Sequence, residues 1–271
     1  MNSSNFLSSE HVADIAGIPF HYRIDGSEGR PWLVFSNSLM TDLRLWDRQV
    51  AALGREFRIL RYDQRGHGRT GMPADDCSFE QLSGDLLELL DRLGIAKVGL
   101  VGISMGAATA ICLAGRHGGR IDRLVLADGM AAAPPAGALA WEERIAIART
   151  GGMQALCEPT LKRWFLPDFV AAGGDGLRLV AQMIGETPLE GFVRCARALQ
   201  SYDLRSELDR LDCPVLLMAG AADGQVPDTM RAMAQRVSGA RFIEIPDAGH
   251  LPNIEQPKAF NEALVDFLLP Q

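Results

Sequence analysis

Residues 98–107 read VGLVGISMGA, an apolar run that leads directly into a serine with a glycine two positions away on either side. The apolar run predicts a buried strand, and residues 105–117 predict a helix. A serine between the two must lie on a sharp, strained turn, where Gly102 and Gly106 have no Cβ atoms to collide. The hydroxyl of Ser104 would project from this turn, beside a helix N-terminus that favours developing negative charge. The stretch therefore predicts a nucleophile at the carboxyl end of a strand.

Similar apolar runs recur along the chain and predict a sheet covered on both faces. Continuous runs, as opposed to strict alternation, are typical of strands packed between two layers of helices. They lie at 31–37, 57–63, 98–103, 122–128, 213–220 and 240–248. Residues 18–24 instead alternate and end at Asp25-Gly26, which predicts an early antiparallel strand or hairpin.

Helices are predicted between these strands, notably at 78–94 and 255–269. The first has Ser78 and Gln81 in capping-box positions and Gly94 where the helix should end. Strands that alternate with helices indicate an α/β protein with a doubly wound, mostly parallel sheet.

The alternation stops from about 131 to 207, where the sequence contains helix-like pieces and no convincing strand. Strand signals resume at Cys213. We therefore expect a helical lid (cap) at 131–207, inserted after the sixth strand and placed over the carboxyl edge of the sheet. The core domain would then consist of 1–130 and 208–271.

Composition narrows the class of protein. The net charge of −7 gives no electrostatic footprint for nucleic acid. The five cysteines are odd in number and no two lie close together in the sequence, which favours reduced core residues over disulfides or a zinc site. The N-terminus lacks a basic region followed by a long apolar one, and no apolar run approaches the ~20 residues of a membrane helix. We expect a cytoplasmic protein with no signal peptide and no membrane association.

A serine nucleophile needs a general base, and His250 has the most suitable position for one. It lies in IPDAGHLPN, between the last predicted strand and the last predicted helix. His67, in the glycine-rich turn RGHGRT, is expected to make a structural hydrogen bond. The remaining histidines, which have no useful context, are His11, His21 and His117.

The base needs a carboxylate to orient it, and two aspartates end suitable strands. Asp223 follows the penultimate strand and gives the chain order serine, aspartate, histidine, so it is the preferred partner. Asp128 follows the strand after the nucleophile and is expected to be a turn or cap residue, although a role in the triad stays open.

Backbone N–H groups should bind the oxyanion. We expect them to be those of Met105, after the serine, and Leu39, in the loop after strand 31–37.

These motifs together resemble the α/β-hydrolase family over nearly the whole chain. They are SNSLMTDLRLWD, RYDQRGHGRT, GISMGA, AGAADGQVP and AGHLPNIEQP, in that order. Within the family the chain is most similar to 3-oxoadipate enol-lactonases, which share the Asn37-Ser38-Leu39 loop, a lid pattern from Trp141 to Phe165, and EGFVRCARAL at 190–199. The chain departs from the lactonase pattern at Met40, where glycine is usual, and over LADGMAAAPP at 126–135.

The resemblance implies an α/β-hydrolase fold and hydrolysis of 3-oxoadipate enol-lactone to 3-oxoadipate, in aromatic-acid degradation, through an acyl-enzyme. The substrate would be a small molecule, and no metal or organic cofactor would be needed. A basic side chain should meet the substrate carboxylate. Of the lid cations, Arg144 is the candidate, and Trp141, three residues before it, is the other candidate substrate-binding residue of the lid. The other lid cations are Arg149, Lys162, Arg163, Arg178, Arg194 and Arg197.

Other activities of the same fold remain open. They are those of a general carboxylesterase, a carbon–carbon bond hydrolase and a perhydrolase, which share the triad and differ in the lid. A non-catalytic receptor for a small ligand is a further alternative, because fold does not fix function. A homodimer is the default expectation for an oligomer, although no interface signal supports it.

Overall fold

The structure is a computed structural model that describes residues 8–72, 74–135 and 137–269. The expectation of no signal peptide rests partly on residues 1–7, which lie outside the described residues.

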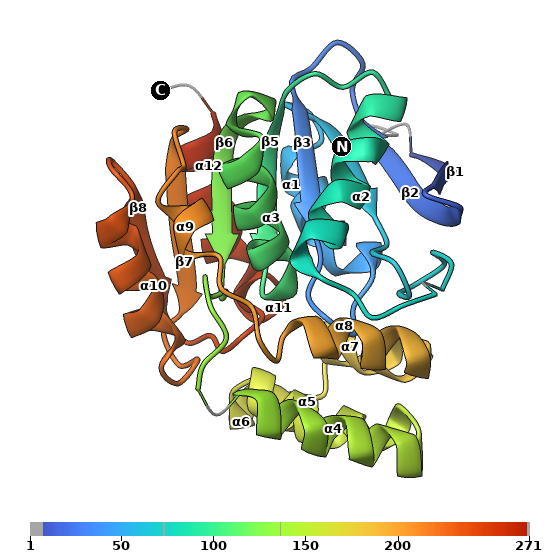
Figure 1. The fold of residues 1–271 in the computed structure, drawn as a ribbon. Helices are drawn as coiled ribbons and strands as arrows, with labels where there is room; N and C mark the ends of the chain where they lie inside the picture. Colours follow the sequence, from blue (N-terminus) through green and yellow to red (C-terminus); the bar gives the residue numbers. More distant parts are fainter. Residues whose placement is uncertain (1–7, 73, 136, 270–271) are drawn as a thin grey trace, which may run out of the picture.

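A sheet of eight strands lies at the centre of the described part of the chain (Figure 1). The strands span Ser9–Ile15 (β1), Ile18–Gly26 (β2), Trp32–Ser36 (β3), Arg58–Tyr62 (β4), Val98–Ile103 (β5), Ile121–Ala127 (β6), Val215–Gly220 (β7) and Arg241–Ile245 (β8). Their order in the sheet is β1-β2-β4-β3-β5-β6-β7-β8. The pairs β1–β2 and β2–β4 are antiparallel, and the other five pairs are parallel. The predicted doubly wound, mostly parallel sheet is confirmed.

The first strand is the main element that the sequence did not reveal. β1 pairs with β2 through a tight turn at Ala16 and Gly17, which both adopt positive φ angles (50° and 78°). Such a turn matches the twist of a two-stranded hairpin. β1 lies at the edge of the sheet and buries only Ile15 fully, so its sequence lacks the apolar pattern of a core strand.

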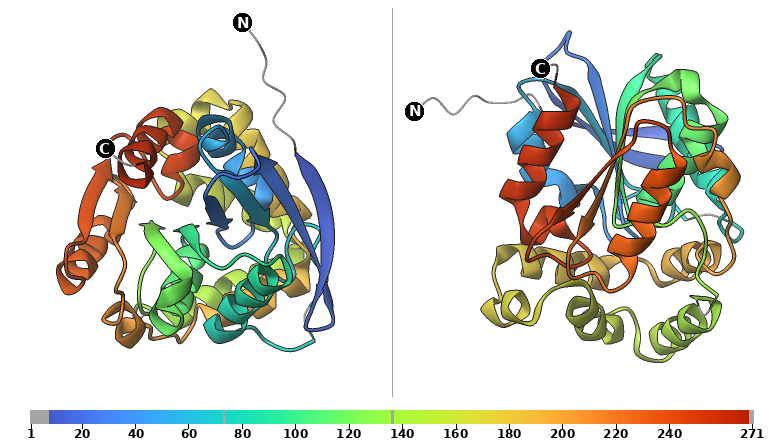
Figure 2. Two further views of the ribbon diagram at one scale, coloured as in Figure 1. Left: turned by 90° about the horizontal axis from the view of Figure 1, so that it is seen from above. Right: turned by 90° about the vertical axis from the view of Figure 1, so that its left-hand side faces the viewer.

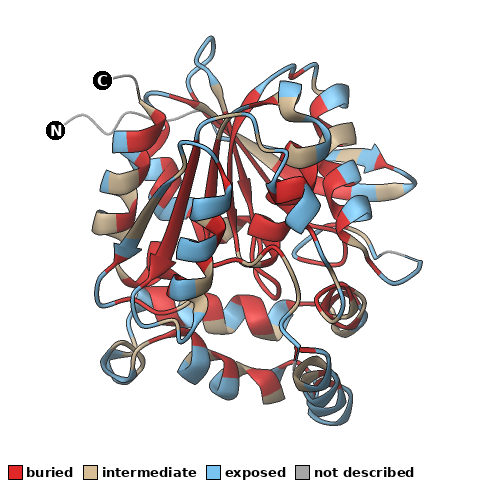
Figure 3. Ribbon diagram, turned by 60° about the vertical axis from the view of Figure 1, so that its left-hand side comes forward, coloured by how far each residue is buried: buried red, intermediate tan, exposed pale blue. Residues whose placement is uncertain are grey.

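Helices cover both faces of the sheet (Figure 2, right). On one face lie α1 (Asp47–Leu53) and α12 (Pro257–Leu268), and on the other α2 (Phe79–Arg92), α3 (Met105–Arg116) and α10 (Val226–Arg236). Short helices complete the core at Leu43–Trp46 (η1), Gly118–Arg120 (η2), Arg205–Leu208 (α9) and Pro252–Glu255 (α11). The central strands β3 to β7 are almost wholly buried (Figure 3), which explains their continuous apolar sequences, whereas the edge strands β1 and β8 are more exposed.

Two helix predictions can be compared with the structure in detail. The capping box of α2 is confirmed: Ser78 accepts from the N–H of Gln81, and the Gln81 side chain accepts from the N–H of Ser78. The helix predicted at 255–269 is confirmed as α12, which begins at Pro257, two residues later than predicted, because a break at Gln256 separates it from the short helix α11. Gln256 precedes Pro257, and the proline ring disfavours helical backbone at the residue before it.

Besides α9, five helices lie between β6 and β7 in the described part of the chain. They are α4 (Gly137–Gly151), α5 (Gln154–Trp164), α6 (Pro167–Ala172), α7 (Asp175–Glu186) and α8 (Leu189–Ala198). They gather below the sheet in Figure 1, at the end toward which the parallel strands point. They therefore face the edge where an α/β sheet carries its chemistry. Among the described residues, no helix is long and apolar enough to cross a membrane.

Candidate active site

Ser104 occupies a strained turn between β5 and α3, as the glycine spacing predicts. Its φ is 56° and its ψ is −116°, outside the regions that L-residues usually adopt. A Cβ on Gly102 would lie 2.2 Å from the carbonyl oxygen of Gly106, and one on Gly106 would lie 2.2 Å from that of Ser36. Both glycines are thus required by close backbone contacts. The N–H of Ser104 donates to the carbonyl of Ala127 at 2.9 Å, which anchors the turn to the neighbouring strand β6.

The three predicted triad side chains meet at the carboxyl edge of the sheet. Nδ1 of His250 lies 2.7 Å from Oδ2 of Asp223, and its Nε2 lies 2.9 Å from Oγ of Ser104. A carboxylate only accepts, so Nδ1 carries the proton and Nε2 is left to accept from the serine hydroxyl. This tautomer is the one in which the histidine can take a proton from the serine. Both His250 and Asp223 are mostly buried, which shields the relay from bulk water.

The loop that carries His250 is held by the insertion between β6 and β7. The N–H of His250 donates to the carbonyl of Trp164, the last residue of α5, at 2.7 Å, and the two rings stack with centroids 5.7 Å apart. The buried carboxylate of Glu255 accepts from the N–H groups of Gly249 (2.7 Å) and Leu166 (2.8 Å). The position of the imidazole therefore depends on the helical insertion as well as on the sheet.

The loop after β3 packs directly against the start of α3, where the oxyanion donors were predicted. Met105 is the first residue of α3, so its N–H has no acceptor within the helix. Leu39 lines the same cavity as Ser104. Buried Asn37 pins the loop, since its Nδ2 donates to the carbonyl of Tyr62 (2.7 Å) and its Oδ1 accepts from Nε1 of Trp46 (2.8 Å).

Two further residues of this loop stand out: Met40, already noted as a departure from glycine, and Ser38, for which the sequence had predicted no individual role. Met40 has a φ of 62°, a left-handed conformation in which glycine is the usual residue, although its side chain is fully buried. Ser38 is also fully buried and lines the cavity, and its hydroxyl has no hydrogen-bond partner among the described residues. A ligand in the cavity would offer that hydroxyl a partner.

The cavity above Ser104 has a volume of about 420 Å³ and is lined by both the core and the helical insertion. The predicted residues Trp141 and Arg144 lie in its wall, with the guanidinium carbon of Arg144 4.4 Å from the ring centroid of Trp141. Arg163 lines the same cavity, although no sequence motif singled it out among the other cations.

Neither arginine has an ion-pair partner among the described residues. Desolvation lowers the pKa of Arg144. Desolvation and the nearby charge of Arg144 lower the pKa of Arg163 to about 10, so both guanidinium groups still carry their charge at neutral pH. Two close, unpaired cations beside a nucleophile make a site that attracts an anion.

Asp128 is the second aspartate that the sequence singled out, and it lies beside the triad. A ring nitrogen of His250 and a carboxyl oxygen from each of Asp128 and Asp223 lie within 4.8 Å of one another. These are types of group that could hold a metal ion. However, His250 uses both ring nitrogens within the relay, and Asp128 accepts from the N–H of Gly220 at 2.8 Å. The donor set therefore fits a hydrogen-bonded relay better than a cation site.

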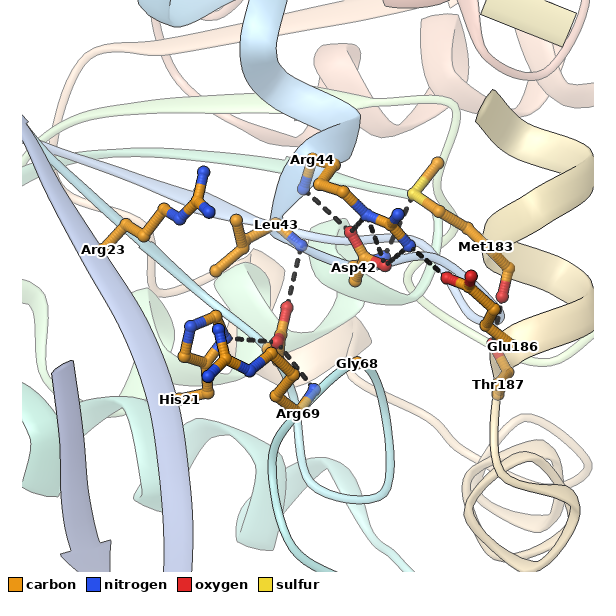
Figure 4. A pocket seen from close by; sticks show the side chains of 11 residues that line it. His21, Arg23, Asp42, Leu43, Arg44, Gly68, Arg69, Met183, Glu186 and Thr187 are labelled. Atoms are coloured by element: carbon orange, nitrogen blue, oxygen red, sulfur yellow. Dashed lines mark hydrogen bonds and ion pairs between the residues drawn. The ribbon is translucent and has the colours of Figure 1, made fainter. Parts of the chain in front are cut away.

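A second cavity of about 220 Å³ contains another histidine–aspartate pair (Figure 4). Nδ1 of His21 lies 2.7 Å from Oδ2 of Asp63, but no serine or cysteine is among the described residues that line this cavity. Its arginines are also neutralised: Arg23 and Arg69 pair with Glu10, and Arg44 pairs with Asp42 and Glu186. His67, as expected, makes a structural hydrogen bond, from Nδ1 to the carbonyl of Arg65 at 3.1 Å.

The five cysteines are free, in agreement with the sequence prediction. The fold nevertheless brings two of them together, since the sulfur atoms of Cys77 and Cys195 lie 3.2 Å apart. Their separation in the sequence gave no sign of this contact.

Comparison with known proteins identifies relatives over nearly the whole chain. A family model described as the alpha/beta hydrolase family matches residues 25–263. A 3-oxoadipate enol-lactonase of Acinetobacter baylyi is 34% identical over 250 residues, which cover 91% of this chain and 92% of the relative. A putative carbamate hydrolase RutD of a Caulobacter species is 29% identical over 245 residues, covering 88% of this chain and 91% of the relative.

A solved structure is similar as well. The crystal structure of the enol-lactonase from Burkholderia xenovorans LB400 superposes with a TM-score of 0.91 and 41% sequence identity. The match covers 95% of this chain and 99% of the other.

Proposed function

The chain belongs to the alpha/beta hydrolase family, and from that premise we propose that it hydrolyses 3-oxoadipate enol-lactone to 3-oxoadipate through an acyl-enzyme on Ser104. The observation that carries the proposal is the unbroken relay from Asp223 through His250 to Ser104, which opens into a cavity with two unpaired arginines. The relatives named as enol-lactonases support the choice of substrate.

In the first half of the reaction, Ser104 attacks the lactone carbonyl while Nε2 of His250 accepts its proton. Asp223 stabilises the imidazolium that forms and keeps the ring in the required tautomer. The N–H groups of Leu39 and Met105 bind the oxyanion of the tetrahedral intermediate. The ring C–O bond then breaks, and His250 returns the proton to the leaving enol, which remains attached to the acyl group because the ester was cyclic.

In the second half, water attacks the acyl carbonyl while His250 takes its proton as general base. The ester bond to Oγ of Ser104 then breaks, and His250 returns the proton to that oxygen. The enol tautomerises to the ketone, so the product lacks the hydroxyl that could close the ring again. Hydrolysis is therefore difficult to reverse.

The arginines supply the selectivity for an anionic substrate. Arg144 is held over Trp141, and Arg163 lies close enough for its charge to affect Arg144, so a carboxylate between them would relieve their mutual repulsion. We further propose that 131–207 acts as a lid on the core formed by 1–130 and 208–271. In that arrangement the lid contributes both the anion site and the carbonyl of Trp164 that anchors His250.

The test compares the enol-lactone with its methyl ester, in which the carboxylate charge is removed, and with p-nitrophenyl acetate. The proposal predicts the highest kcat/KM for the free lactone, and a preference over the methyl ester that collapses in Arg163→Gln. Arg149→Gln is the matched control, since Arg149 is an exposed residue of α4 that does not line the cavity. Equal turnover of the lactone and its methyl ester by the unaltered enzyme would refute the anion site, and efficient ester hydrolysis without lactone turnover would refute the substrate.

A further inference from the structure

Asp128 is a buried carboxyl group that the reaction described above does not use. It follows β6, adopts a left-handed backbone (φ 42°), and is 2% exposed. One of its oxygens, Oδ1, accepts from the N–H of Gly220 at 2.8 Å. The other, Oδ2, is buried and has no donor among the described residues.

The missing partner of Oδ2 is explained by the neighbouring carboxyl of Asp223. β6 and β7 are adjacent parallel strands, so the residues that follow them emerge side by side at the edge of the sheet. Two ionised carboxylates in a buried site repel each other, and one of them is expected to keep its proton. With that proton on Asp128, the oxygen that lacks a donor becomes a donor itself.

We propose that Asp128 is a positioning residue, whose protonated carboxyl donates a hydrogen bond to Asp223 and holds the Asp223 carboxylate against His250. This inference rests on the proposed function, because it assigns a role within the same relay. In this arrangement Asp223 accepts from His250 on one side and from Asp128 on the other, so its side chain is fixed from two directions.

The electrostatic surroundings favour the proton on Asp128. Burial and the negative charge of Asp223 raise the pKa of Asp128 well above its usual range, and the Gly220 N–H opposes them. The titratable and charged groups around the pair are His250, whose Nδ1–H donates to Asp223, and Arg163 across the cavity, whose charge interacts with that of Asp223. Both interactions involve Asp223, so they favour the negative charge there.

Infrared difference spectroscopy tests the protonation state without any need for turnover. The spectrum of the unaltered protein minus that of Asp128→Asn at pH 7 should contain the carbonyl band of a protonated carboxylic acid. The same band should be retained in Ser104→Ala, in which the pair of carboxyl groups is unchanged. Absence of the band from the unaltered protein, or its survival in Asp128→Asn, would overturn the proposal.

The pH profile of kcat/KM gives a second readout that a purely structural role would not predict. Asparagine keeps a donor toward Asp223 and an acceptor for Gly220, so Asp128→Asn should leave the midpoint of the acid limb in place. If Asp128 were ionised instead, its negative charge would favour protonation of the nearby His250. Removal of that charge in Asp128→Asn would then lower the midpoint of the acid limb by about one pH unit or more. Such a shift would contradict the proposal.

A comparison of two substitutions completes the test. Asp128→Ala removes the donor, and we expect kcat to fall by at least about tenfold with little change in KM, while Asp128→Asn recovers most of the loss. Equal kcat in the alanine and asparagine variants would overturn the positioning role. If Ser104→Ala keeps full activity, the proposed function fails instead, and the infrared band still decides whether Asp128 holds a proton.

Discussion

The substitution Gly106→Ala should separate the nucleophile from its oxyanion site. The new Cβ would lie 2.2 Å from the carbonyl oxygen of Ser36 and 2.8 Å from that of Asn37. Both are backbone atoms, so the clash cannot be relieved by rotating a side chain. The start of α3 must move away from the end of β3 by roughly 1 Å to restore ordinary contact.

That movement separates Met105, at the start of α3, from Leu39, in the loop after β3, and these are the two proposed oxyanion donors. A displacement of about 1 Å in a catalytic site can cost on the order of 100-fold in rate. We therefore expect kcat/KM to fall about 100-fold in Gly106→Ala, with a loss of about 1–3 kcal/mol in the free energy of unfolding.

Gly84→Ala is the matched control for this experiment. Gly84 is an exposed residue inside α2, and a Cβ there would meet nothing within 4 Å. Its replacement should leave kcat/KM unchanged and stabilise the protein by up to about 1 kcal/mol. Steady-state kinetics and thermal unfolding measure both effects. If Gly106→Ala kept a kcat/KM within about threefold of the original, the inference that this contact sets the catalytic geometry would be refuted.

Three further outcomes are expected. Asn37→Ala leaves the indole N–H of Trp46 without an acceptor and should cost about 1–3 kcal/mol in denaturant unfolding, and an unchanged midpoint would argue against that role. Arg163→Gln should raise KM for the lactone about tenfold and leave KM for p-nitrophenyl acetate unaltered, and an equal effect on both would speak for a structural role. Asp128→Asn should raise the melting temperature increasingly as pH rises above about 4. Above this pH the Asp128 carboxyl ionises in the unfolded state but stays protonated in the folded state of the unaltered protein. Rising pH therefore lowers the free energy of unfolding of the unaltered protein until the pH passes the raised pKa of Asp128. A pH-independent difference in melting temperature would contradict this reasoning.

The meeting of the three candidate catalytic side chains could be predicted because it depends on chain order and strand ends. Ser104 directly follows β5, and Asp223 and His250 lie in the loops after β7 and β8, so the parallel strands bring all three to one edge of the sheet. The fold class followed from the same alternation of strands and helices, and the family match confirms it. By contrast, β1 was missed, because an exposed edge strand needs no apolar pattern.

The substrate pocket was less predictable, because it depends on how the helices of the insertion pack together. Seven cations lie between 144 and 197, and only the folded arrangement shows that Arg163 joins Arg144 in the cavity wall. The contact between Asp128 and Asp223 needed the pairing of β6 with β7, which a single sequence does not fix. Cys77 and Cys195 likewise meet only through the packing of α8 on the core.

The most direct test of the central claim is the rate of 3-oxoadipate enol-lactone hydrolysis by the unaltered protein and by Ser104→Ala. The loss of enol-ester absorbance reports the reaction, and melting temperatures confirm that the variant is folded. We predict rapid turnover that falls by at least about 1,000-fold in the variant. Turnover by Ser104→Ala within about tenfold of the original would contradict a reaction through an acyl-enzyme on this serine.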